Sequence, residues 1–208
     1  MKRLFDWALE NPEYTPTLAR LARYVPEQSV AREYGYGPQM VDLLIQQQAY
    51  GEAFDAYRAF AGSAPDPTEM TASAYPPLDW RLIDNYDSGA RIFDDDTVEI
   101  FANPARTGNV AQLVTVLNPG RYTLAFDVSE TVGRDGEILF VQTCLSRTGG
   151  ETAGGETRVL LRNGDLRIPI SVPPGCDFQR LSLSIAGGNE ASGALLRSVR
   201  LSPNTVAE

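Results

Sequence analysis

The sequence predicts a segregated α+β protein, in which short N-terminal helical hairpins are followed by an antiparallel β-sandwich. Up to about residue 62, apolar residues recur every three or four positions, as in amphipathic helices. A stretch rich in Pro, Ser, Ala and Thr follows without periodicity, as in a linker. Later residues alternate between apolar and polar in short runs, as strands do. We therefore expect a helical region at 1–62, a linker at 63–77 and a sandwich at 78–204.

Composition and charge exclude several classes of function. The 208-residue chain is 43% hydrophobic and 22% charged, which is typical of a globular protein. Its formal net charge of −9 argues against a nucleic-acid partner, whose phosphates it would repel. The chain has no apolar run of about 18 residues, so we expect no membrane insertion. It also has no histidine, which removes imidazole bases and imidazole-dependent metal sites, and we expect neither metal nor cofactor.

Helices are expected near residues 37–47 and 50–60 of the helical region. The segment LLIQQQAYGEAFDAYRAF, at residues 43–60, resembles the junction and second helix of a tetratricopeptide repeat. The resemblance implies a protein partner for the helical region, and it suggests that the chain is a piece of a longer repeat protein. An ordinary helical hairpin would give the same pattern. The residues that carry the resemblance are Tyr50, Ala53, Phe54, Tyr57 and Phe60.

The linker is compatible with either a flexible tether or a partly docked strap, because its prolines stiffen it. Beyond it, Asn118-Pro119-Gly120 and Asn163-Gly164 each predict a hairpin, and the Gly-rich residues 148–156 are expected to be a mobile loop. One face of the later strands should be buried, with Leu166, Ile168, Ile170, Val172, Leu181, Leu183 and Ile185 pointing inward. Strands are expected near residues 79–84, 90–93, 97–102, 111–117, 121–128, 137–145, 157–161, 165–172, 179–186 and 195–202.

This β-rich half resembles the jelly-roll sandwiches of carbohydrate-binding modules. The resemblance rests on the number of strands, on the LNPGRYTLAF segment at residues 117–126, and on a closing strand, LLRSVRL, expected to pair beside the opening one. It implies a jelly-roll topology and a glycan ligand, with a protein ligand as the alternative. No motif of the family transfers a binding residue to this chain.

Sugar-binding surfaces combine exposed aromatic rings with amides, carboxylates and guanidinium groups. The segment around Tyr86 supplies this mixture, whereas Trp80 alternates with Leu82 and fits the core equally well. Amides inside apolar strands should be hydrogen-bonded if buried, unless they face a ligand or solvent. The net charge favours a neutral or cationic glycan over an acidic one. The expected ligand-binding residues are Trp80, Tyr86, Asp87, Arg91, Gln142 and Gln179.

Acidic residues define the catalytic alternative. The run Asp94-Asp95-Asp96 is either a solvated turn or a calcium site, although it lacks the spacing of an EF-hand loop. A carboxylate-dependent glycan hydrolase or lyase would need two acids facing each other across a cleft. Asp94, Asp96 or Glu99 could serve with Glu137, but no feature of the sequence brings them together. We therefore expect no catalytic activity. The remaining alternative is that the chain is a purely structural cap of a longer repeat protein.

The two cysteines, Cys144 and Cys176, lie at or beside expected strands. They fit either a disulfide or two buried thiols. A disulfide would favour a periplasmic or extracellular location, because disulfides persist in oxidising compartments.

Overall fold

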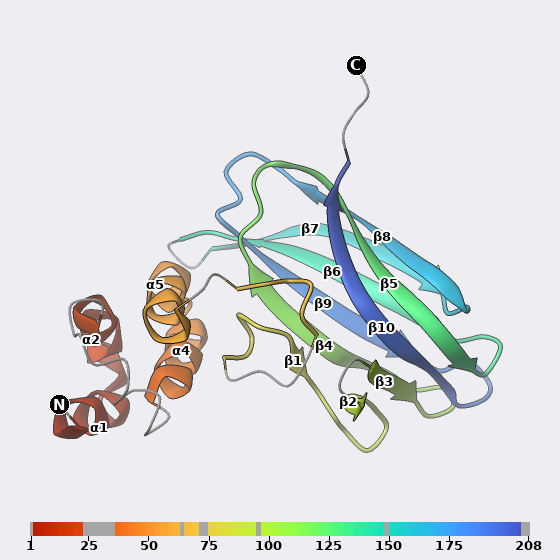
Figure 1. Cartoon of the computed structure of the whole chain (residues 1–208), viewed down its shortest axis with the longest axis horizontal. Coiled ribbons are helices and arrows are strands. Elements are labelled where there is room, and N and C mark those ends of the chain that lie inside the picture. Colours follow the sequence, from red (N-terminus) through yellow and green to blue (C-terminus); the bar gives the residue numbers. More distant parts are fainter. Residues whose placement is uncertain are drawn as a thin grey trace.

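The structure, a computed structural model, describes residues 2–22, 36–62, 65–70, 75–94, 97–147 and 150–204. Helices occupy its N-terminal part and strands the remainder, so the segregated α+β prediction is confirmed (Figure 1). The helical elements are α1 (Lys2–Glu10), η1 (Pro12–Tyr14), α2 (Thr15–Ala22), α4 (Tyr36–Gln46) and α5 (Tyr50–Ala61). The strands are β1 (Arg81–Leu82), β2 (Ser88–Asp94), β3 (Thr97–Ala102), β4 (Thr107–Thr115), β5 (Gly120–Val132), β6 (Glu137–Leu145), β7 (Glu151–Leu160), β8 (Gly164–Val172), β9 (Phe178–Ala186) and β10 (Ser192–Pro203).

The strands form two antiparallel five-stranded sheets that face each other as a sandwich. Sheet A has the order β1-β4-β9-β6-β7, and sheet B has the order β2-β3-β10-β5-β8. Alternate side chains of both sheets meet in one core, which includes every inward residue expected on β8 and β9. Among the largest buried side chains in this core are Trp80, Phe126 and Phe140.

Two predicted hairpins are wrong. Residues 118–120 join β4 in sheet A to β5 in sheet B, and Asn163-Gly164 joins β7 in sheet A to β8 in sheet B. Both turns therefore cross between the layers. Alternation in a sequence shows which face of a strand is buried, but it does not show which strand is its neighbour. Among the described residues, consecutive strands pair directly at β2–β3 and at β6–β7.

Two further strand predictions need correction. Residues 151–156 belong to β7 and are not a loop. Because β7 is an edge strand with mostly exposed residues, its sequence lacks the alternation that marks a half-buried strand. The closing strand β10 pairs with β3 and β5, and not with β1, the opening strand.

The α4–α5 pair packs directly on sheet A. A single apolar cluster joins the inner faces of α4 and α5 to Val114, Leu145 and Phe178 of the sandwich. The Phe178 ring lies 5.1 Å from the Phe54 ring and 5.9 Å from the Tyr50 ring, between centroids. A tetratricopeptide arrangement is not supported, because α5 covers a sheet and the expected segment forms only two short helices. The aromatic stripe of α5 is the apolar face that any helix packed between another helix and a sheet would bury, so it is not specific to a repeat.

The linker residues that the structure describes are docked on the sandwich. Met70 enters the core between the sheets, and the Trp80 indole Nε1 donates a hydrogen bond to the Pro67 carbonyl at 2.9 Å. The Val114 backbone N–H donates to the Pro77 carbonyl at 2.6 Å. These contacts favour the strap interpretation of the linker. Among the described residues, no helix is long and apolar enough to cross a membrane.

Polar contacts surround the buried junction between helices and sandwich. Arg180 on β9 donates two hydrogen bonds to Glu151, at 3.0 and 2.6 Å, and the Tyr50 hydroxyl donates to the same carboxylate at 3.4 Å. The hydrogen bonds from Arg180 contribute most to lowering the pKa of Glu151. Burial, followed by the charge of Glu151, raises the pKa of Tyr50.

The lowered pKa of Glu151 predicts a pH-dependent contribution to stability. Since the folded state favours the ionised carboxylate, its contribution is fully present above the ordinary pKa of a glutamate, about 4.3, and is lost as the pH falls through the lower folded value. The side chain is about a third exposed, so we expect less than about 1 kcal/mol. Urea unfolding at pH 7 should therefore show E151Q slightly less stable than the parent, with the difference shrinking as the pH falls below about 4.3 and the Glu151 carboxylate is protonated. A constant difference across this range would contradict the assignment.

Cys144 on β6 and Cys176, two residues before β9, form a disulfide. Cys176 is buried in the sandwich core and Cys144 is packed against it. The bridge resolves the two alternatives left open by the sequence, and bridges of this kind are typical of oxidising compartments.

Removing the disulfide should lower stability without changing the fold. The double variant C144S/C176S should lose about 2–4 kcal/mol in the free energy of unfolding, because the open chain gains conformational entropy when unfolded. Urea unfolding followed by circular dichroism measures this loss. The parent in a dithiol reductant serves as the control, and should unfold like the double variant. Equal stabilities of the oxidised parent and the variant would contradict this prediction.

Candidate functional site

Three of the six expected ligand-binding residues are buried. Trp80 is 1% exposed, and its ring lies 6.4 Å from the Phe126 ring in the sandwich core. Gln179 is fully buried, where its amide accepts a hydrogen bond from the Leu117 N–H and donates one to the Cys176 carbonyl. Trp80 therefore cannot act as a stacking platform. The Gln179 amide stabilises the neighbouring loops through its bonds to Leu117 and Cys176. Both residues are removed from the candidate site.

Gln142 is 3% exposed and links the two sheets. Its amide Nε2 donates to the Ser171 carbonyl at 2.9 Å, and its Oε1 accepts from the Ser171 N–H at 3.3 Å. Ser171 lies on β8, an edge strand of sheet B, so Gln142 takes the place of a missing neighbouring strand. Its two polar groups are thus already engaged with the protein.

The other three expected residues lie on the turn before β2 or on β2 itself, and we call this surface the β2 corner. Tyr86 is at the tip of the turn that joins β1 to β2, with its side chain 94% exposed. Asn103 holds this turn, because its side-chain amide donates to the Tyr86 carbonyl and its backbone N–H donates to the Asp87 carbonyl. Arg106 lies 3.7 Å from the Asp87 carboxylate. The residues of the β2 corner are Asp84, Tyr86, Asp87, Arg91, Glu99 and Phe101.

Phe101 forms the floor of the β2 corner on the outer face of sheet B. It pairs with Gly89 on one side and with Gly193 on the other, so neither neighbour covers its ring with a side chain. The Arg91 guanidinium lies 5.6 Å from the ring centroid, within the range of a cation–π contact. A side chain at Gly89 would meet both the Asp84 carboxylate and the Phe101 ring, which places these two groups side by side.

The charges of the β2 corner are partly paired. The Arg91 Nε donates to the Glu99 carboxylate at 2.6 Å, and this bond is the main cause that raises the pKa of Arg91, with a smaller contribution from Asp84. Arg91 therefore stays cationic and fixed against the Phe101 ring. Carboxylates outnumber guanidinium groups among these residues, so the surface suits a neutral ligand better than an anion.

Sequence reasoning missed Phe101 as a member of this site and considered Glu99 only as an acid catalyst. The segment TVEIFA at residues 97–102 contains the pattern that indicates this exposed face. Its alternation buries Val98 and Ile100 and leaves Glu99 and Phe101 on the opposite face. Arg91 lies on the neighbouring strand, directly opposite Glu99.

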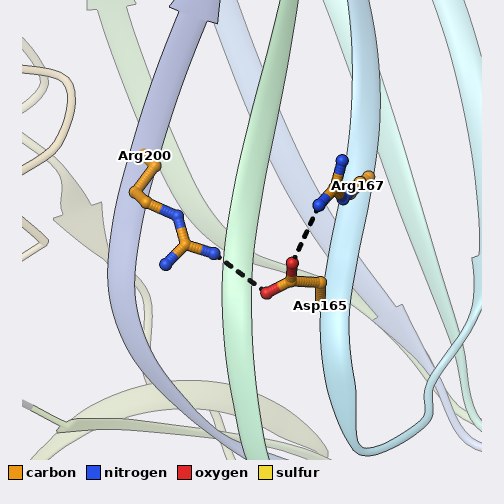
Figure 2. Close-up of polar contacts among 3 residues, drawn as sticks. All are labelled: Asp165, Arg167 and Arg200. Atoms are coloured by element: carbon orange, nitrogen blue, oxygen red, sulfur yellow. Dashed lines mark hydrogen bonds and ion pairs between the residues drawn. The ribbon is translucent and has the colours of Figure 1, made fainter.

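Another part of the same outer face carries a cluster of ion pairs. Figure 2 shows the Asp165 carboxylate between Arg167 of its own strand, at 3.0 Å, and Arg200 of β10, at 2.9 Å. The hydrogen bond from Arg167 is the main cause that lowers the pKa of Asp165. All three side chains are well exposed and satisfy one another, so this cluster is a solvated surface network.

The catalytic alternative finds no support in the described residues. Glu99 projects from the outer face of sheet B and is bonded to Arg91, whereas Glu137 begins β6 of sheet A. Asp95 and Asp96 lie outside the described residues, as does the side chain of Asp94. Within the described part of the chain, no group of three or more Cys, Asp or Glu side chains is arranged to hold a metal ion.

Comparisons with known proteins give only distant likenesses. No protein-family model and no curated protein matches the chain. Similar solved structures include a CBM4 protein (20% identity, 68% of this chain and 97% of that one, TM-score 0.43) and TmCBM61 in complex with beta-1,4-galactotriose (11%, 60% and 88%, 0.39). Another is the enzymatically active domain of bacteriophage CBA120 tailspike protein 4 (13% identity, TM-score 0.43), of which the match covers 60% of this chain but only 19% of that chain. At these identities and TM-scores, the likenesses carry no argument about ligand or activity.

Proposed function

We propose that this protein is a non-catalytic binding protein whose sandwich recognises a neutral glycan at the β2 corner. One observation carries the proposal. Tyr86 presents an almost fully exposed ring from a turn whose backbone is held by Asn103. Exposing a large aromatic ring on a fixed turn costs hydrophobic free energy, which a stacked ligand would recover.

The polar groups beside Tyr86 fit the hydroxyl groups of a sugar. The carboxylates of Asp84 and Asp87 accept hydrogen bonds, and the guanidinium of Arg91 donates them. Phe101 supplies a second apolar surface, on which Arg91 already rests. A neutral sugar needs this combination of acceptors, donors and ring faces, whereas an acidic sugar would be repelled by the surplus of carboxylates.

The helical region has a separate proposed role in protein contacts. The exposed rings of Trp7 and Tyr14 lie 4.7 Å apart, between centroids, and are the part of this region best suited to a protein partner. A purely structural role is the second candidate, favoured by the burial of Phe178 beneath Tyr50 and Phe54. Under either role, the division into residues 1–62, 63–77 and 78–204 remains a prediction.

The variant Y86A tests the glycan proposal. Binding of neutral oligosaccharides, first found on a glycan array and then measured by calorimetry, should weaken about tenfold or more, because an exposed aromatic anchor typically contributes at least 1.4 kcal/mol. The melting temperature should not change, since the Tyr86 ring packs on nothing in the fold.

The matched control is Y14A. It removes another exposed tyrosine, in the helical region and far from Tyr86 in the sequence, and should leave glycan binding unchanged. The proposal fails if no neutral glycan binds, or if Y86A binds as tightly as the parent.

A further inference from the structure

A groove of about 490 Å³ opens on the side of the sandwich where the edge strands β7 and β8 face each other. Its volume lies within the range of pockets that hold small molecules. The β2 corner is at the opposite edge of sheet B, so the two places share no residue. The lining of the groove includes Arg121, Tyr122, Gln142, Gly155, Thr157 and Asn204.

Two glycines keep one wall of this groove free of side chains. Gly155 pairs with Gln142, so a side chain at Gly155 would point to the same side of the sheet as the Gln142 amide, into the groove. A Cβ atom added at Gly155 would meet no atom within 4 Å, which shows that the space beside it is open. At Gly154, the extra residue of a β-bulge, a Cβ atom would lie 3.1 Å from Gln142 Cγ.

The groove cannot accept an added peptide strand along β8. Pro169 has no N–H, and both backbone groups of Ser171 are already bonded to Gln142. A ligand here must therefore bind through side chains and ring faces, as small molecules do.

The lining of the groove carries a positive charge and therefore favours an anion, whereas the chain as a whole has a negative net charge. Among the described residues, Arg121 is the only charged residue of the lining, and no ion pair involves its guanidinium. Arg121 pairs with Ser171 and shares the outer face of sheet B with it, so Arg121 borders the groove at its outer rim. Glu156 lies between two lining residues of β7, but the alternation of the strand turns it to the other face, where Arg158 binds it. A guanidinium without a carboxylate partner binds carboxylates in a bidentate geometry.

The remaining groups suit the hydroxyls and the ring of a sugar. The Tyr122 ring is fixed, because its hydroxyl donates to the Asn118 carbonyl at 2.9 Å. Thr123 donates to the Asn204 Oδ1 at 2.9 Å, which leaves the Asn204 amide N–H groups as donors. Thr157 adds a hydroxyl group on the β7 wall, and Ser171, which shares the outer face with Arg121, adds one at the rim. From this combination, we propose that the β7–β8 groove is a second binding site, specific for a carboxylate-bearing sugar.

Calorimetric titration with a di-uronate, the corresponding neutral disaccharide and acetate tests this site. The di-uronate should bind at least tenfold more tightly than the neutral disaccharide, and acetate should not bind at the same concentrations. R121Q should remove the preference for the di-uronate. G155V should abolish its binding, because the valine side chain fills the open space beside the groove without meeting a neighbour.

Two further variants keep the test specific. A153V adds the same kind of bulk on β7 outside the groove and should bind the di-uronate normally. Y86A should also bind it normally, so failure at the β2 corner and failure at the groove are distinguishable. The proposal is overturned if the di-uronate does not bind, if it binds no better than the neutral disaccharide or acetate, or if it binds G155V as it binds the parent. Should G155V fail to fold, R121Q alone decides the outcome.

Discussion

Replacing Phe178 by alanine should lower the free energy of unfolding by about 3–5 kcal/mol. Phe178 begins β9, is almost fully buried, and lies against Tyr50 and Phe54 of α5. The Arg147 guanidinium lies 5.7 Å from the same ring. Truncation would therefore leave a cavity between the helices and sheet A and would also remove the surface on which Arg147 rests. Urea unfolding followed by circular dichroism measures the loss.

A second phenylalanine provides the matched control. Phe93 on β2 is 63% exposed, so F93A should change stability by no more than about 0.5 kcal/mol. We also expect F178A to separate the unfolding of helices from that of the sandwich, since the variant removes the central contact between them. A loss below about 1 kcal/mol in F178A, or equal losses in both variants, would show that this junction contributes little.

For half-buried strands, the sequence predicts which segments are strands and which of their faces are buried, because both depend on local alternation, which the exposed edge strand β7 lacks. On β8 the inward residues follow from alternation alone, and the structure buries all of them. The sequence does not predict which strands pair with one another. A turn such as Asn118-Pro119-Gly120 can close a hairpin or cross between layers, and packing against strands far along the chain decides the outcome. Tertiary contacts of this kind leave no trace in the turn itself.

Candidate binding residues were harder to predict, because exposure depends on the whole fold. Tyr86 was identified correctly as exposed, since a turn rich in polar residues has no core to enter. The local sequences around Gln142 and Gln179 do not distinguish them from glutamines on a protein surface. In the structure, each is buried and hydrogen-bonded to backbone groups of another segment. The exposure of the Phe101 ring depends on Gly89 and Gly193 of its two neighbouring strands, and Gly193 lies far from it in the sequence.

Trp80 provides the other large expected effect. W80A should lower the free energy of unfolding by about 3–5 kcal/mol, because Trp80 fills the core beside Phe126 and holds the strap through the Pro67 carbonyl. W80F separates these two contributions. It keeps most of the apolar contact, so its loss should be smaller, with about 1 kcal/mol from the missing hydrogen bond.

Circular dichroism is the appropriate probe, since both variants remove a fluorophore. Y86A, whose ring contacts no part of the fold, is the control and should unfold like the parent. A near-parental stability of W80A together with weakened glycan binding would return Trp80 to the ligand surface. The expected combination, large destabilisation with intact binding in the folded fraction, separates a residue that builds the sandwich from the exposed ring at Tyr86, which the sandwich only supports.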